Sequence, residues 1–195
     1  MPKILMKEFS DIAISSGTTK ISKIRREKNK TDYNPAQDYY KQIREAIIAS
    51  HLKGLGISHI LKAADDCSNP KRKSNYKLIA TKYKQWQGKK DYEWFSPPRG
   101  AFNFSGSEIV LNPEIGLIDD GVMHVIKLYF SEEKISQNRA NYMIHLMSEQ
   151  FSDTYQYHVL DIRRKKLFNA TGNHNTFIIS TRSEIAGLET AWDSV

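Results

Sequence analysis

The sequence predicts an α+β fold in which a basic, helical N-terminal subregion packs on a small, mainly antiparallel sheet. Apolar residues recur at helical spacing as far as Trp86 and alternate from Glu108 onward, and Pro97-Pro98 interrupts regular structure between the two patterns. The 195 residues, 39% of them apolar, suit one domain or two small ones that share an interface. We divide the chain into a basic N-terminal arm or short helices (1–34), a helical basic subregion (35–98) and a sheet-containing subregion (99–195).

The first element is expected to be a short helix that ends in a glycine turn. Phe9 and Ile12 have helical spacing, and Gly17 follows as a residue that tolerates a left-handed cap. The basic residues 18–26 leave two alternatives, the second helix of a helix-turn-helix or a basic arm or strand. The arm or strand is favoured, because Lys23 stands where the motif needs an apolar residue.

Three further helices are expected before the sheet. A core helix follows Asn34-Pro35 and ends at Gly54, and residues 57–64 form a short one. Asn69 and Pro70 then start a helix, as its N-cap and first-turn residue. Its apolar face carries Tyr76, Ile79, Ala80, Tyr83 and Trp86. Cations occupy the opposite face and its flanks: Lys73, Lys77 and Lys84, with Lys71, Arg72 and Lys82.

A hairpin gives the sheet a defined register. Two alternating runs, 108–119 and 122–130, are joined by Asp120-Gly121, a pair that suits the positive φ angles of a type I′ turn. This turn sets the cross-strand partners. They are Leu117 with His124, Ile115 with Ile126, and Glu114 with Lys127. The buried face is expected to carry Ile109, Leu111, Ile115, Leu117, Ile126, Leu128 and Phe130.

The order of the second half is expected to be strand, strand, helix, strand, strand. Ser136 can cap a helix that runs to about Phe151 and covers the sheet. Residues 157–168 and 176–181 have the composition of two more strands, and the acidic segment around Trp192 suggests a short closing helix.

The positive charge of the chain is concentrated in its first half. Residues 1–100 contain 21 Lys and Arg against 10 Asp and Glu, a balance of +11, whereas residues 101–195 contain 8 against 12, a balance of −4. A one-sided positive field attracts polyanions, of which nucleic acid is the commonest, although a charged surface also simply favours solubility.

The leading hypothesis is a nucleic-acid-binding protein that contacts mainly the phosphate backbone. Cations bind phosphates and exposed aromatic rings stack on bases, and residues 71–99 offer both. Four consecutive cations, 163–166, would extend the site, although they also suit an exposed strand end that discourages edge pairing. The proposed contact residues are Arg25, Arg26, Lys71, Arg72, Lys73, Lys77, Lys84, Lys89, Lys90, Trp94, Arg163, Arg164, Lys165 and Lys166.

A second hypothesis is a metal-dependent nuclease that uses Glu114, Lys127 and Asp161. Carboxylates beside a lysine on a small sheet can hold Mg²⁺ and offset charge on phosphate, and the arrangement resembles the PD-(D/E)XK nuclease core. It departs from that core at Val125, where an acid is expected. Mg²⁺ or Mn²⁺ is the cofactor that this resemblance implies, and no other cofactor is expected. As an alternative, Glu114 and Lys127 form a cross-strand ion pair worth about 0.2–1 kcal/mol.

The sequence argues against a disulfide-bonded, zinc-binding, membrane-spanning or secreted protein, and it leaves a protein-binding subunit as a third hypothesis. Cys67 is the single cysteine, and the six histidines lack the spacing of a zinc motif, so neither a disulfide nor a zinc site is expected. No apolar run is long enough to span a membrane, and residues 1–9 do not resemble a secretion signal. We expect a cytoplasmic protein without membrane contact. A subunit or adaptor that binds a protein partner through the Trp192 segment is the third hypothesis.

Overall fold

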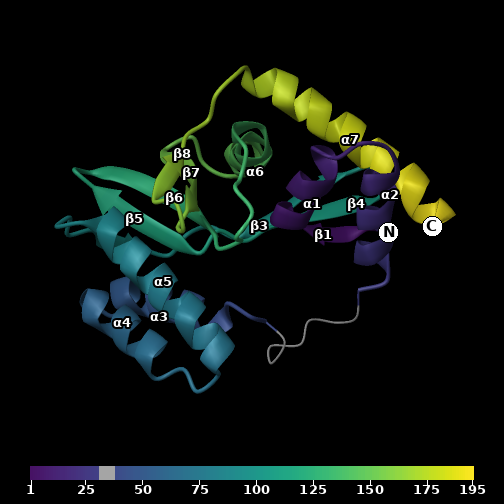
Figure 1. The fold of residues 1–195 in the computed structure, drawn as a ribbon. Coiled ribbons are helices and arrows are strands. Elements are labelled where there is room, and N and C mark those ends of the chain that lie inside the picture. Colours follow the sequence, from purple (N-terminus) through teal and green to yellow (C-terminus); the bar gives the residue numbers. More distant parts are fainter. Residues whose placement is uncertain (31–37) are drawn as a thin grey trace.

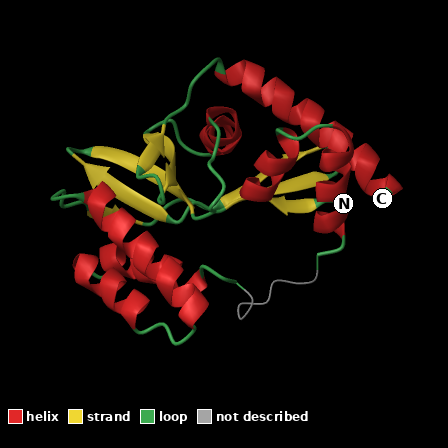
Figure 2. Cartoon of the chain, viewed as in Figure 1, coloured by secondary structure: helices red, strands yellow, loops and turns green. Residues whose placement is uncertain are grey.

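The structure is a computed structural model that describes residues 1–30 and 38–195. The described residues form seven helices and two mixed sheets, which confirms the α+β class (Figures 1 and 2). The helices are α1 (Met6–Ala13), α2 (Gly17–Lys28), α3 (Lys41–Leu52), α4 (Gly56–Asp65), α5 (Pro70–Gln87), α6 (Gln137–Gln150) and α7 (His174–Ser194). The strands are β1 (Lys3–Leu5), β2 (Glu93–Phe95), β3 (Gly100–Phe104), β4 (Ser107–Leu111), β5 (Ile115–Asp119), β6 (Val122–Tyr129), β7 (Tyr155–Asp161) and β8 (Lys166–Phe168).

The larger sheet has the strand order β2-β5-β6-β7-β8. Strands β6 and β7 are parallel and are connected through α6, and the other neighbours in this sheet are antiparallel. The predicted hairpin register is confirmed, since Leu117 lies opposite His124 and Ile115 opposite Ile126. Asp120 and Gly121 have φ angles of 49° and 77°, the positive values that a type I′ turn requires.

Helices cover both faces of the larger sheet (Figure 1). On one face, Ile115, Ile126 and Leu160 pack in one apolar cluster with residues of α3, α4 and α5. On the other face, Val125 and Val159 belong to a second cluster with α6, α7, the N-terminal helices and the smaller sheet, whose order is β1-β4-β3. The N-terminal segment therefore packs with the second half of the chain, and α3–α5 form a separate layer.

Most of the predicted helices are confirmed. The segment 57–64 lies within α4, Asn69 caps α5, and Ser136 caps α6 by accepting a hydrogen bond from the Arg139 N–H. Residues 17–28 form α2, so the short-helix alternative holds and the arm or strand is wrong. The start signal Asn34-Pro35 lies outside the described residues. Strand β2 pairs with β5, so residues on both sides of Pro97-Pro98 share one sheet.

The expected strand 108–119 is wrong, because this segment forms two strands in different sheets. Strand β4 pairs with β1 and β3, whereas β5 pairs with β2 and β6. Pro113, which lies between them, has no N–H to donate to a ladder, and the chain changes sheet there. Ile109 and Leu111 are therefore buried in the cluster on the α6 face and not with Ile115.

The last two expected strands are also corrected. Residues 157–168 form β7 and β8, joined by a turn in which Lys165 has a φ of 55°. The segment 176–181 is part of α7, which is much longer than the short closing helix expected. Its β-branched composition favours a strand, but Ile178, Thr181 and Ile185 are buried at helical spacing, and this packing decides the structure.

Within 1–30 and 38–195, no helix is both long and apolar enough to cross a lipid bilayer.

Candidate functional site

Helix α5 is anchored so that its two flanks face different neighbours. The Asn69 side chain accepts hydrogen bonds from the backbone N–H groups of Lys71 (3.0 Å) and Arg72 (3.2 Å), which sets where the helix begins. Tyr76 and Tyr83 are fully buried on its inner face. With this face fixed, the cations of the helix divide between a flank that faces α4 and a flank that faces β7 and β8.

The α4 flank carries Lys73, Lys77 and Lys84. Lys77 Nζ lies 2.9 Å from an Asp65 carboxylate oxygen at the end of α4, and this hydrogen bond lowers the pKa of Asp65. Lys73 also acts on Asp65 through its charge, and Lys84 lies two turns beyond Lys77 on the same flank. These three lysines thus share one side of the helix.

The opposite flank meets the turn between β7 and β8. Arg163 Nη2 donates to Asn75 Oδ1 at 2.8 Å, and Arg163 Nε donates to the Phe130 carbonyl at 2.8 Å. Lys71 and Lys82 lie on the same flank, four residues before Asn75 and seven after it. The Arg163 side chain is only 10% exposed, so it fastens the turn to α5 and offers little surface to a ligand.

The other cations of the turn have different surroundings. Arg164 lies 3.2 Å from the buried Asp161 carboxylate, and Lys165 is exposed at the tip of the turn. Lys166 lies 4.3 Å from the centre of the Phe168 ring, on the α6 face of the sheet.

Arg72 of α5 lies over the Tyr39 ring, and the Tyr39 hydroxyl accepts a hydrogen bond from Asn75. We call the cations between the helix and the turn the α5–turn surface: Lys71, Arg72, Lys82 and Lys165, with Arg163 as their anchor. Arg164 is not part of it, because its partner Asp161 lies on the α6 face of the sheet, beside Tyr129.

Arg25 and Arg26 lie far from this surface. Helix α2 packs against α1 and α7, at the opposite end of the molecule from α5 (Figure 1). Arg26 lies 3.4 Å from Glu27 and 3.9 Å from Asp11. The basic first half of the sequence is therefore split between two ends of the fold.

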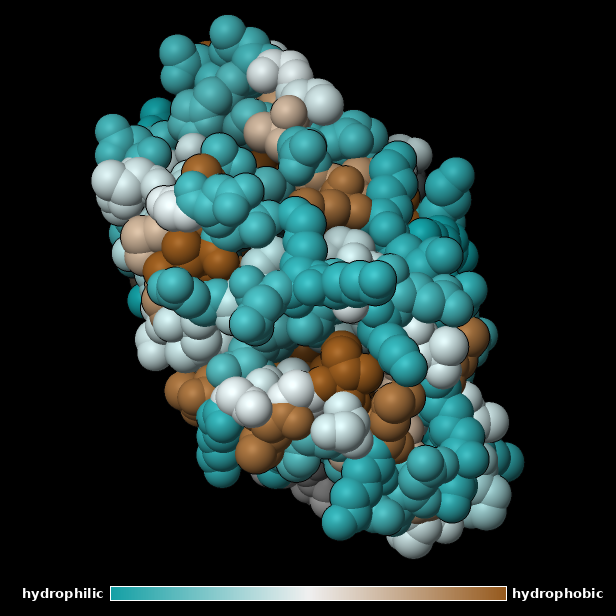
Figure 3. All heavy atoms as spheres, turned by 90° about the vertical axis from the view of Figure 1, so that its left-hand side faces the viewer, coloured by the Kyte–Doolittle hydropathy of each residue, from teal (hydrophilic) through white to brown (hydrophobic). Residues whose placement is uncertain are grey.

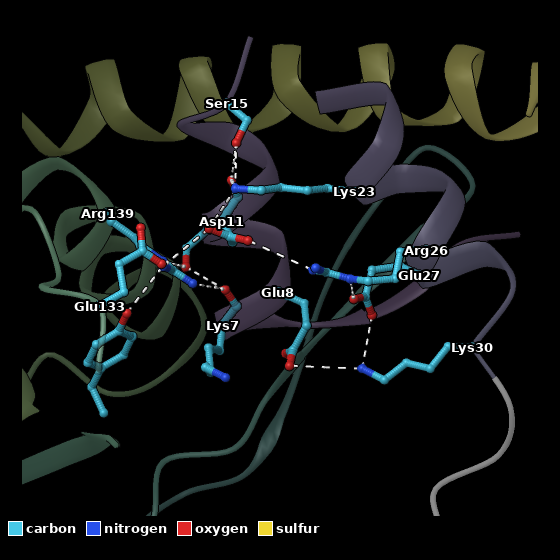
Figure 4. Close-up of polar contacts among 12 residues, drawn as sticks. Lys7, Glu8, Asp11, Ser15, Lys23, Arg26, Glu27, Lys30, Glu133 and Arg139 are labelled. Carbon is cyan, nitrogen blue, oxygen red and sulfur yellow. Dashed lines mark hydrogen bonds and ion pairs between the residues drawn. The ribbon is translucent and has the colours of Figure 1, made fainter. Parts of the chain in front are cut away.

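A charged hollow of about 520 Å³ lies beside Arg26, between α1, α2 and the start of α6 (Figure 4). Asp11 pairs with Lys23 at 2.9 Å and with Arg139 at 3.2 Å, and Glu27 pairs with Lys30 at 3.0 Å. Cations and carboxylates here neutralise each other and join the three helices. We interpret the ion pairs around this hollow as structural links between the helices and not as a binding site.

The three predicted contact residues that follow α5, Lys89, Lys90 and Trp94, differ in how exposed they are. Lys89 is exposed. Lys90 Nζ lies 2.5 Å from an Asp119 carboxylate oxygen and 5.7 Å from the centre of the Tyr92 ring. Trp94 lies in β2 and packs against the cluster under α3 and α5, half-buried. Lys89 and Lys90 thus remain accessible, whereas Trp94 contributes mainly to packing.

The predicted nuclease residues are drawn into internal contacts. Lys127 Nζ donates to Glu114 Oε1 at 2.7 Å and to the Asn112 carbonyl at 3.0 Å, and Glu114 Oε2 accepts from the Leu128 N–H at 2.7 Å. Asp161 accepts hydrogen bonds from Arg164. In the part of the chain that the structure describes, no three His, Cys, Asp or Glu side chains form a group that could hold a metal ion.

One cluster was missed by sequence reasoning. His124 Nδ1 lies 2.9 Å from His158 Nε2, and His158 Nδ1 lies 2.8 Å from Asn169 Oδ1. Burial lowers the pKa of His158 to about 4 and also lowers that of His124. The hairpin register places His124 opposite Leu117, but its hydrogen-bond partner lies on β7, whose parallel pairing with β6 is not visible in a single sequence.

Comparison with known proteins adds no family to this description. No protein-family model, no curated protein and no solved structure matches the chain.

Proposed function

We propose that this protein binds nucleic acid through its phosphate backbone, at the α5–turn surface. The observation that carries the proposal is the 2.8 Å hydrogen bond between Arg163 and Asn75, which joins the basic turn of the acidic half to the most basic helix. Cations that lie far apart in the sequence thereby share one side of the molecule.

The spacing of the surface suits a regular polyanion. Lys71 and Lys82 are eleven residues apart on one flank, which is about 16 Å at 1.5 Å per residue. This length spans about five phosphates of one DNA strand at 3.4 Å each. A line of this kind fits a nucleic acid backbone better than a single compact anion.

Two triple variants provide a matched test. Lys71→Glu/Lys82→Glu/Lys165→Asp changes the α5–turn surface, and Lys73→Glu/Lys77→Glu/Lys84→Glu makes the same change in net charge on the α4 flank. Asp is chosen at position 165 because it tolerates positive φ. Fluorescence anisotropy with a labelled 20-nucleotide strand and its duplex, at several salt concentrations, measures both affinity and salt dependence.

We expect the first triple variant to bind at least about tenfold more weakly and to lose about three units of the slope of log affinity against log salt. The second should keep most of its affinity. Equal losses in both variants would support the wider site that the sequence suggests and remove the special role of the turn. Failure of the unaltered protein to bind either probe at micromolar concentration would refute the proposed function.

A further inference from the structure

A second hollow, of about 270 Å³, lies at the C-terminal end of α5, beside the tip of the β5–β6 hairpin. It is lined by Trp86, Lys90, Tyr92, Leu117, Asp119, His124, Ile126 and Leu167. Figure 3 looks at this side of the molecule, where apolar patches are exposed between hydrophilic side chains.

The hollow continues the α5–turn surface. Trp86 follows Asn75 by eleven residues, three helical turns, so both side chains lie on the flank that faces β7 and β8. Leu167 of β8, which comes directly after the basic turn, lines the same hollow. A strand whose phosphates follow this flank therefore reaches the hollow at its end.

Its walls suit a flat ring. The Trp86 and Tyr92 rings are stacked, with centroids 6.0 Å apart and planes 20° apart, and Leu117, Ile126 and Leu167 supply aliphatic surface. Aromatic planes bind bases by stacking, and every base has a face that can stack. An apolar cavity with a few polar groups is also the usual form of a small-ligand site.

The hydrogen bond that His124 makes through Nδ1 leaves its other ring nitrogen, Nε2, free to accept one. Asn169 Oδ1 can only accept, so His158 Nδ1 carries the hydrogen and His158 Nε2 accepts in the neutral ring. His124 Nδ1 must then donate to His158 Nε2, which leaves His124 Nε2 as an acceptor on a side chain that lines the hollow. Lys90 and Asp119, which pair with each other, add a donor and an acceptor.

We propose that this hollow holds one unpaired base of a single-stranded nucleic acid whose phosphates lie on the α5–turn surface. This inference rests on the proposed function and adds the substrate class, single strands. The base would stack on the Trp86–Tyr92 pair and donate a hydrogen bond to His124 Nε2.

The test follows the fluorescence of Trp86 alone. Trp94→Phe and Trp192→Phe remove the other two tryptophans of the chain. Three probes are titrated: a 12-nucleotide single strand, its duplex, and an abasic strand of equal length that has the same phosphates and no bases. The variant Leu167→Trp, measured by anisotropy in the otherwise unaltered chain, fills the hollow, and a thermal unfolding scan checks that it folds.

We expect the single strand to quench Trp86 and to bind about tenfold more tightly than the abasic strand, within the range of one stacked base. The duplex should bind without quenching. Leu167→Trp should reduce single-strand affinity to that of the abasic strand.

Each other outcome is informative. Equal affinity for the single and abasic strands without quenching, or unchanged affinity in a folded Leu167→Trp variant, would overturn the base site and leave phosphate binding intact. If no polyanion binds, the proposed function fails. A free nucleoside that still quenches Trp86 at millimolar concentration would then support the hollow as a base site independent of the surface.

Discussion

The ion pair of Glu114 and Lys127 is buried, and each of its charged groups is satisfied by further hydrogen bonds. Glu114 is 8% exposed and Lys127 is 5% exposed. Removal of water from two charges is costly, and a pair of this kind persists only where geometry and additional hydrogen bonds compensate. The sequence predicted the pairing across the hairpin, but it could not predict the burial. Lys127 points to the same face of β6 as Val125 and Tyr129, which pack in the cluster with α6 and the smaller sheet.

Replacement of Glu114 by glutamine tests whether this pair is structural. We expect Glu114→Gln to lower the free energy of unfolding by about 3–5 kcal/mol, because Lys127 would be left as a buried charge without its partner. The double variant Glu114→Gln/Lys127→Met should lose less than the sum of the two single variants. Urea unfolding of all four proteins measures this coupling.

The same variants examine the nuclease hypothesis. A Glu114→Gln protein of unchanged stability that has lost a Mg²⁺-dependent cleavage of plasmid DNA would show a catalytic carboxylate. Asp161→Ala serves as the parallel variant, and loss of cleavage in both would favour the hypothesis over a structural pair.

Buried histidines predict how stability depends on pH. Burial lowers the pKa of His51 and of His158 from 6.5 to about 4. Between these two pH values the unfolded chain binds protons that the native protein does not. The stability that the two neutral histidines contribute is therefore fully present above about pH 6.5 and is lost as the pH falls towards 4. Urea unfolding from pH 7.5 to 4.5 measures this decline.

Single substitutions isolate the contribution of each histidine. His158→Gln and His51→Gln should each make the decline shallower between pH 6.5 and 5. An unchanged slope in both variants would contradict the assignment of the pH dependence to these two residues.

At the scale of elements, strand β2 depends on a glycine in its neighbour. A Cβ at Gly116 would lie 2.5 Å from the Phe95 carbonyl oxygen and 2.9 Å from the Phe95 ring. Gly116→Ala should therefore displace β2 and cost about 1–3 kcal/mol, as overpacking does. Urea unfolding measures the cost, and hydrogen exchange of the Trp94 and Phe95 amides detects the loosened strand.

Gly187 provides the matched control for this substitution. It lies in α7, and apart from its chain neighbours and the adjacent backbone of the helix, a Cβ there meets no atom of the described residues within 4 Å. Gly187→Ala should stabilise the protein by about 0.5–1 kcal/mol, because alanine favours the helix. Destabilisation by both substitutions, or by neither, would show that the close approach of Phe95 does not decide the outcome.

Short sequence motifs predicted turns and helix starts correctly where the residues of the motif alone supply the required backbone angles and hydrogen bonds. Asp120-Gly121 supplies both positive φ angles of the hairpin, and Asn69-Pro70 supplies both the cap and the first turn of α5. The strand expected at 176–181 is wrong. These six residues have a β-branched composition, whereas the burial pattern that makes them helical extends to Leu188. A window of six residues is too short to separate these periods.

At the scale of the whole molecule, Arg163 connects the two halves of the proposed site. Arg163→Gln should weaken nucleic acid binding and leave the slope of log affinity against log salt unchanged, because this side chain anchors the turn and does not contact phosphate. It should also lower stability by about 1–3 kcal/mol through lost hydrogen bonds. Anisotropy at several salt concentrations, together with urea unfolding, measures both effects.

Lys165→Asn is the control for the anchor. It removes an exposed charge at a position of positive φ that asparagine tolerates, so stability should not fall, and the salt slope should decrease by about one. If Arg163→Gln reduces the slope as well, the arginine contacts phosphate directly and its role as an anchor is wrong.

The sequence by itself determined the α+β class, the hairpin register, the capped start of α5 and the excess of cations before residue 100, because each follows from neighbouring residues or from composition. Only the tertiary structure decided which cations lie together. Arg25 and Arg26 lie at one end of the molecule with α2, whereas Arg163 contacts Asn75, 88 positions away in the sequence. Long-range contacts of this kind result from the packing of whole helices on the two faces of a sheet, and the local pattern of residues does not specify them.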